Sequence, residues 1–180
     1  VYKRQYRDGR YADRAVTAIR QFAQAQVPFF LMVGFHKPHT PFNAPKKYWD
    51  LYDPSYIDLA RNQFPPKGAP EFAVSGANYV RSFMGIPPAG RFPDDLQRKI
   101  KRAYFACVSY IDAQVGKLLV GLRESGVGET TIVVFTSDHG YQLGEHDLWC
   151  KHTNFETSTK VPLIIRAPDH QAIGKYSRCL

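Results

Sequence analysis

A long amphipathic helix set between short apolar runs is the feature that most constrains this fold. The helical pattern begins at Asp94, where acidic residues suit the positive end of a helix dipole, and it stops before Gly126. Apolar runs typical of strands precede it at residues 29–35 and follow it at residues 131–136. Strand, helix and strand in this order predict a right-handed crossover between parallel strands. The predicted fold class is therefore α/β, with a largely parallel sheet flanked by helices. The apolar face of the helix comprises Leu96, Ile100, Tyr104, Cys107, Ile111, Val115, Leu118 and Leu122.

Three further elements are predicted around this core. Residues 8–26 have helical spacing, start with an Asp-Gly turn signal and stop before Pro28. Residues 45–52 fit one short helix. Residues 161–165 form a third apolar run, whose proline suits an edge strand or the start of a strand.

The stretch from residue 53 to residue 91 lacks any regular pattern and is rich in proline and glycine. A structureless stretch of about 40 residues is longer than ordinary loops, so it is either a functional surface loop or an insertion. We expect it to lie over the surface with little regular structure and to contribute to the rim of a cleft.

Composition excludes several classes of protein. With 44% apolar and 14% aromatic residues, the composition is that of a globular protein. No apolar run approaches the length of a membrane span, so we predict no membrane partner. The net charge of +8 indicates either an anionic partner or a solvated basic surface. The cations of the long helix lie mainly off its apolar face without an aromatic stacking platform, so we predict no nucleic-acid partner.

The three cysteines have no zinc-binding or redox spacing, and they indicate neither a compartment nor a disulfide. Cys107 falls on the apolar helix face, where a cysteine acts as a small hydrophobe. The chain has no starting Met, and we expect it to be an internal fragment of a longer protein, in which a missing signal peptide says nothing about secretion.

Chemically active residues follow two of the predicted strands. The sequence His36-Lys37-Pro38-His39 ends the first, and Ser137-Asp138-His139-Gly140 ends the second, with Lys151 beyond it. Because ligands bind beyond the carboxyl ends of strands in open α/β sheets, we expect His39, Asp138, His139 and Lys151 to face a common cleft. A carboxylate beside an imidazole can bind a metal, and a lysine can bind an anionic oxygen. Each motif alone is more typical of a cap or a turn.

Taken together, the motifs resemble a known family. The segments FFLMVGFHKPHTPF, DLQRKIKRAYFACVSYIDAQVGKLL and TIVVFTSDHGYQLGEHDLWCKHTNFETSTKVPLII are similar to type I sulfatases of the alkaline phosphatase superfamily. The resemblance covers residues 11–166 apart from the proline-rich stretch. It implies a sulfatase or alkaline-phosphatase-like fold, with residues 1–180 forming part of a single catalytic domain. It also implies a periplasmic, secreted or lysosomal protein.

The resemblance also implies roles for individual residues. By this resemblance, Asp138 and His139 are ligands of one Ca²⁺ ion, although histidine is an unusual calcium ligand. Lys151 contacts the sulfate, and His39 donates a proton to the leaving oxygen. Lys37 is either a further substrate contact or a solvated lysine. We assign no catalytic role to His36, Glu145 and His146, and we expect them to shape the site.

The chain departs from the family in one respect. The family's nucleophile is a formylglycine made from a cysteine in a Cys-x-Pro-Ser-Arg motif, and none of the three cysteines here lies in that motif. The family's paired aspartates for the metal are absent as well. We therefore expect this chain to carry half of a site, to be inactive by itself, and to have its Ca²⁺ site completed by residues outside it.

Three functions remain open at this point. The first is hydrolysis of the sulfate ester of a sulfated sugar or glycan. The second is a phosphodiesterase or phosphonate monoester hydrolase of the same superfamily, because the Asp-His-Gly motif is shared across it. The third is a non-catalytic protein that binds anionic glycans on a sulfatase fold, against which the retained metal and acid residues argue. The sequence does not indicate the oligomeric state.

Overall fold

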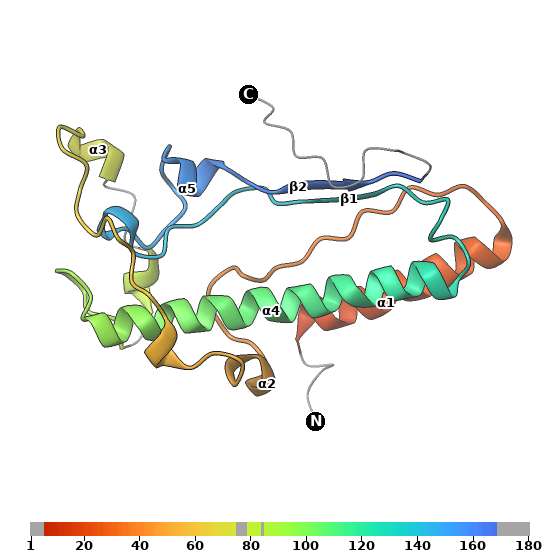
Figure 1. Ribbon diagram of the computed structural model, residues 1–180, viewed down its shortest axis with the longest axis horizontal. Coiled ribbons are helices and arrows are strands. Elements are labelled where there is room, and N and C mark those ends of the chain that lie inside the picture. Colours follow the sequence, from red (N-terminus) through yellow and green to blue (C-terminus); the bar gives the residue numbers. More distant parts are fainter. Residues whose placement is uncertain (1–5, 75–78, 84, 169–180) are drawn as a thin grey trace.

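Two packed helices and a small sheet form the framework of the computed structural model, which describes residues 6–74, 79–83 and 85–168 (Figure 1). The α-helices are α1 (Arg7–Ala25), α2 (Lys46–Trp49), α3 (Glu71–Val74), α4 (Asp94–Glu124) and α5 (Glu156–Thr159). Short 3-10 helices lie at Pro54–Tyr56, Tyr79–Ser82 and Glu145–Asp147, and the strands are β1 (Val133–Thr136) and β2 (Leu163–Arg166). The predicted helices at residues 8–26, at residues 45–52 and from Asp94 are confirmed.

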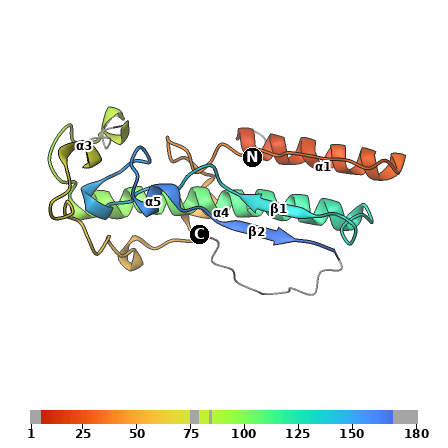
Figure 2. The same ribbon diagram turned by 90° about the horizontal axis from the view of Figure 1, so that it is seen from above.

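Helix α4 extends along most of the molecule, and α1 packs beside it (Figures 1 and 2). The two helices approach closely at Gly121, where an added Cβ would lie 3.1 Å from a methyl group of Val16. At the C-terminal end of α4, Gly126 has a φ of 74° and its N–H donates to the carbonyl of Arg123, so the helix ends in the left-handed conformation that glycine favours.

The buried face of α4 matches the predicted apolar face only in part. Ile100, Cys107 and Leu122 are buried as expected, but Val115 and Leu118 are only half-buried. Since α1 and α2 cover another side of the helix, small and polar residues are buried there instead. These residues are Ala103, Ala106, Tyr110, Gln114 and Gly121, while Gln97 is buried near the start of α4, where it donates to the carbonyl of Phe92.

The predicted parallel sheet is wrong for the residues that the structure describes. β1 and β2 pair antiparallel, with Val133 opposite Arg166 and Thr136 opposite Leu163. Residues 29–35 are extended but are not a strand, because no neighbouring strand bonds them within the described ranges. They run in the same direction as β1 (Figures 1 and 2), so the two segments lead toward the same end of the molecule.

Residues 29–35 are also not uniformly buried, although their side chains form a continuous apolar run. Their exposure alternates along the chain, and Phe30 and Met32 are 88% and 81% exposed. Phe29 and Leu31 are half-buried, and the ring of Phe29 stacks on that of Phe22 in α1 at 5.3 Å. One face of this segment therefore lies against the helices, and the other carries exposed apolar side chains.

The proline-rich stretch from residue 53 to residue 91 contains only single-turn helices within its described parts. It is nevertheless anchored, because Ile57 and Val80 are buried and the Lys101 ammonium donates to the carbonyl of Asp58. Its contribution to the rim of a cleft stays a prediction.

By length and composition, α4 is the one helix in the described residues that could cross a membrane, with a mean hydropathy of 1.3 over its most apolar window. Long core helices have the same composition. The packing of α4 against α1 and α2, with Gln97 and Gln114 buried on its surface, is that of a core helix.

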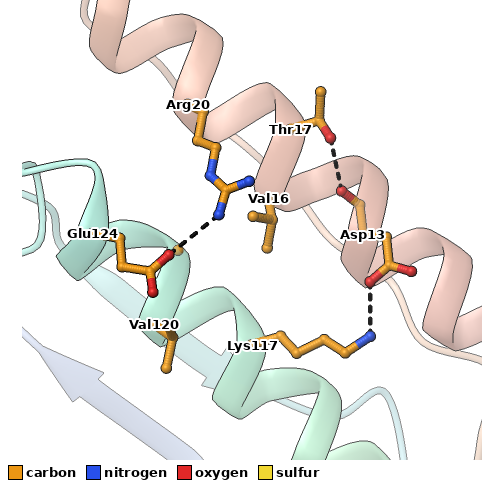
Figure 3. Close-up of a pocket in the computed structure, with 8 residues that line it drawn as sticks. Asp13, Val16, Thr17, Arg20, Lys117, Val120 and Glu124 are labelled. Atoms are coloured by element: carbon orange, nitrogen blue, oxygen red, sulfur yellow. Dashed lines mark hydrogen bonds and ion pairs between the residues drawn. The ribbon is translucent and has the colours of Figure 1, made fainter.

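A surface hollow of about 480 Å³ lies between α1 and α4 (Figure 3). Arg20 donates to Glu124 at 3.2 Å and Lys117 donates to Asp13 at 2.7 Å across it, so its charged groups neutralise one another. None of the predicted site residues lines this hollow. Exposed ion pairs of this kind stabilise a protein by about 1 kcal/mol at most.

Candidate active site

The loop that follows residues 29–35 is held together by buried polar contacts. Lys37 is only 9% exposed, and its ammonium donates to the carbonyls of His39 at 2.8 Å and Pro41 at 2.6 Å. Burial lowers the pKa of this ammonium. A solvated lysine does not fit this environment. Because an ammonium has three N–H donors and two of them are used here, contact with a substrate oxygen stays a prediction for Lys37.

His39 has a defined tautomer. Its Nδ1 lies 2.7 Å from the carbonyl oxygen of Thr40, and because a carbonyl only accepts, Nδ1 carries the hydrogen. Its ring lies 4.7 Å from that of His36, and its side chain is half-buried. Transfer of a proton between Nε2 of His39 and a substrate stays a prediction.

A buried carboxylate holds the start of the same loop. Asp8, in the first turn of α1, is 2% exposed and accepts hydrogen bonds from the backbone N–H groups of His36 at 2.6 Å and Lys37 at 3.2 Å. In the sequence, Asp8 belongs to an Asp-Gly turn signal. An acidic residue at a helix start is common, so no pattern in the sequence distinguished this one.

Asp138 and His139 follow β1 and face one another. Nδ1 of His139 donates to the carbonyl of Gly140 at 2.6 Å, and its Nε2 lies 3.6 Å from an oxygen of Asp138. A histidine that binds a metal usually donates its other ring N–H to a carbonyl or carboxylate in this manner. The Asp138 side chain is 85% exposed, so its oxygens are accessible.

Asp138 and His139 fit a partial ligand set for the calcium ion that the resemblance implies. Within the described ranges, no group of three or more His, Cys, Asp or Glu side chains gathers to hold a metal. Calcium takes about six to eight oxygen ligands, so Asp138 and His139 supply a minority of them. A calcium site at Asp138 and His139, completed by ligands from outside this chain, stays a prediction.

Backbone contacts hold the chain around this pair. The N–H of Gly140 donates to the carbonyl of Ser158, and the N–H of Gln142 donates to that of Cys150, both at 2.8 Å. A Cβ added to Gly140 would overlap the carbonyl oxygen of Thr157. Lys151 is half-buried and follows directly after Cys150, so this hydrogen bonding places it in the same folded unit as Asp138 and His139.

Gln142 is a site-supporting residue that the sequence analysis missed. It is fully buried, and its Oε1 accepts hydrogen bonds from the hydroxyl groups of Thr153 at 3.2 Å and Ser158 at 3.5 Å. Its position within a polar loop carries no periodic signal, so only the tertiary structure shows its role.

Three aromatic rings connect the two loops. The ring of Phe42, three residues after His39, lies 5.6 Å from Tyr141, two residues after His139. Both rings contact Tyr104 of α4, at 5.4 and 5.6 Å. The His39 loop and the Asp138 loop thus meet over α4, although a cleft shared by all the predicted residues stays a prediction.

The segment between Gly144 and Asp147 ties the proline-rich stretch to this region. The N–H of His146 donates to the carbonyl of Asn62 at 2.7 Å, and its ring packs on Phe155 at 4.7 Å. Glu145 accepts a hydrogen bond from the N–H of Leu143 at 2.6 Å. These are contacts that shape the backbone.

The cysteines of the described chain are not nucleophiles. Cys107 and Cys150 are both at most 2% exposed, and burial raises the pKa of Cys107 to about 11 and that of Cys150 above its usual value. The assignment of Cys107 as a small buried hydrophobe is confirmed. Cys179 lies outside the described residues.

We expect neither Cys107 nor Cys150 to react with iodoacetamide in the native protein at pH 8. A raised pKa keeps each thiol protonated at that pH, and the thiolate is the reactive form. Mass spectrometry of the individual cysteine peptides measures the labelling, and the same peptides from protein unfolded in denaturant are the control. Labelling of Cys107 at the same rate in both samples would contradict this burial.

Comparison with known proteins places these observations in context. The chain matches the model of the sulfatase family over residues 2–178. Iduronate 2-sulfatase from Homo sapiens is 41% identical over 171 residues, which are 92% of this chain and 31% of that protein. Choline-sulfatase from Rhizobium meliloti is 34% identical over 146 residues, which are 81% of this chain and 28% of that protein.

A solved structure shows the same fold. Phosphonate monoester hydrolase of Agrobacterium radiobacter superposes with a TM-score of 0.70 at 27% identity, over 92% of this chain and 34% of that one. The chain thus spans about a third of the length of the proteins that it matches.

Proposed function

This chain belongs to the sulfatase family, and from that membership we propose that it forms part of an enzyme that hydrolyses the sulfate ester of a sulfated sugar or glycan. The observation that carries the proposal is the meeting of two loops over α4, one with His39 and the other with Asp138 and His139. The proposed acid and the proposed metal ligands therefore belong to loops that pack against each other.

Each residue of the proposed site has a chemical task. Lys151 supplies positive charge for the sulfate oxygens, and Lys37 has one N–H left to reinforce it. As an imidazolium with hydrogens on both ring nitrogens, His39 donates the proton of its Nε2 to the leaving alkoxide oxygen as that oxygen separates from sulfur, and the ring keeps the Nδ1–H that bonds Thr40. Asp138 and His139 would hold the calcium ion. A bound calcium ion would stabilise charge on the sulfate, and a formylglycine hydrate from elsewhere in the protein would supply the nucleophile.

Two observations favour a sulfated sugar as substrate. The chain is similar to iduronate 2-sulfatase along 92% of its length, and its net charge of +8 suits a polyanionic glycan. Choline sulfate and phosphonate monoesters are the competing substrates, because choline-sulfatase and a phosphonate monoester hydrolase are also similar to this chain.

The experiment that tests this function measures kcat/KM of the complete protein on a 2-sulfated uronate, choline sulfate and a phosphonate monoester. We expect the sulfated uronate to be the best substrate. A larger kcat/KM for the phosphonate would overturn the proposal in favour of phosphonate hydrolysis. Binding of sulfated glycans without turnover of any ester would instead indicate the non-catalytic protein.

Lys151→Ala tests the sulfate contact. Loss of a charged hydrogen-bond donor costs about 1.5–3 kcal/mol, so we expect kcat/KM for the sulfated uronate to fall about tenfold to hundredfold, through both KM and kcat. Lys160→Ala is the matched control, because Lys160 is exposed and pairs loosely with Glu156 at 3.9 Å. Equal activity of the Lys151 and Lys160 variants would remove Lys151 from the site.

A further inference from the structure

Asp8 is a buried carboxylate whose hydrogen bonds leave its own helix. It lies in the first turn of α1 but is not its N-cap, which is Tyr6. Both of its oxygens accept from His36 and Lys37, 28 and 29 residues further along the chain. A buried charge is costly unless it is hydrogen-bonded or paired, so these two bonds are what makes its burial tolerable.

The far side of the same loop is held by Lys37. Its ammonium donates to the carbonyls of His39 and Pro41, and Asp8 is close enough to favour its charged form. The loop is therefore fixed from both sides, by an anion at the N–H groups of its first residues and by a cation at its later carbonyls.

The orientation of the His39 ring depends on that loop. Its Nδ1–H donates to the carbonyl of Thr40, which lies between the two carbonyls that Lys37 holds. Any shift of the backbone at residues 36–41 would therefore redirect Nε2, the atom that transfers the proton.

From these contacts we propose that Asp8 is a positioning residue that orients His39 for proton transfer to the leaving group. The role rests on the proposed function. Asp8 does not touch the substrate in this proposal and acts only through the backbone of residues 36–41.

The test is Asp8→Asn in the complete protein. An asparagine of the same shape keeps one acceptor oxygen and places an NH₂ group against the second backbone N–H, so one of the two hydrogen bonds is lost. Misplacement of a catalytic group by about 1 Å costs about a hundredfold in rate, so we expect kcat on an alkyl sugar sulfate to fall about tenfold to hundredfold.

The leaving group separates positioning from general damage. An aryl sulfate leaves as a weakly basic phenolate that needs no proton, so its kcat should change by less than about threefold. The KM values of both esters should be unchanged. Equal losses on the two esters would overturn the proposal and reduce Asp8 to a structural role.

Asp13→Asn is the matched control. Asp13 lies on the same helix, but its side chain is 54% exposed and pairs with Lys117 at the surface. This variant changes the charge of α1 by the same amount and should hydrolyse both esters at the wild-type rates.

A measurement on the unmodified protein keeps the proposal testable if Asp8→Asn does not fold. The amides of His36 and Lys37 belong to no helix or strand, yet they should exchange with deuterium more slowly than exposed loop amides, because Asp8 accepts their hydrogens. Exchange at the rate of an exposed loop would overturn the proposal. If the wild-type protein hydrolyses no sulfate ester, the proposed function fails, and the exchange rates still decide whether Asp8 holds the loop.

Discussion

Gly140→Ala is expected to inactivate the protein and to destabilise it by about 3 kcal/mol, the upper end of the usual cost of overpacking. The added Cβ would overlap the carbonyl oxygen of Thr157 and would lie 3.3 Å from the carbonyl oxygen of Lys160. Both obstacles are backbone atoms, which cannot rotate away as a side chain can. Separating the two segments would also break the 2.8 Å hydrogen bond from Gly140 to Ser158.

The reason for inactivation is the position of Gly140 in the chain. It directly follows His139, and its carbonyl accepts the hydrogen that fixes the tautomer of that histidine. A displaced Gly140 would therefore misplace the proposed metal ligands as well as weaken the fold.

Gly116→Ala is the matched control for this prediction. A Cβ at Gly116, within α4, would meet no atom within 4 Å, and alanine is favoured over glycine in a helix by about 1 kcal/mol. Denaturant unfolding of the complete protein measures both variants. A Gly140→Ala protein as stable and as active as Gly116→Ala would show that the chain is not closely packed at this position.

His39→Ala is expected to lower kcat on an alkyl sugar sulfate by about 10²–10⁴, the range that general acid catalysis contributes. An alkoxide is a poor leaving group without a proton, and Nε2 of His39 is the proposed donor of that proton. On an aryl sulfate the loss should stay below about tenfold, because a phenolate leaves without protonation.

Comparison of the two esters with the same variant serves as the control, since a folding defect would reduce both rates equally. Steady-state kinetics on the complete enzyme provide the measurement. An equal loss on the two substrates would exclude His39 as the general acid and leave it a binding or structural residue.

The residues of the proposed site could be named from the sequence because its chemistry is carried by adjacent residues. His39, Asp138, His139 and Lys151 lie in short motifs next to apolar runs, and their resemblance to sulfatases needed no three-dimensional information. The supporting residues could not be found in this way. Asp8 and Gln142 act on backbone or side chains far away in the sequence, so no local pattern marks them.

The sequence by itself determined the local elements. The ends of α1 and α4 and the positions of β1 and β2 follow from side-chain periodicity, from charge at a helix start and from glycine at a helix end, which act within a few residues. Only the tertiary structure decided the antiparallel pairing of β1 with β2 and the extended, half-exposed state of residues 29–35. It also decided the burial of Lys37. The physical reason is that a strand exists only with a hydrogen-bonded neighbour, and burial depends on which distant segment lies against a residue.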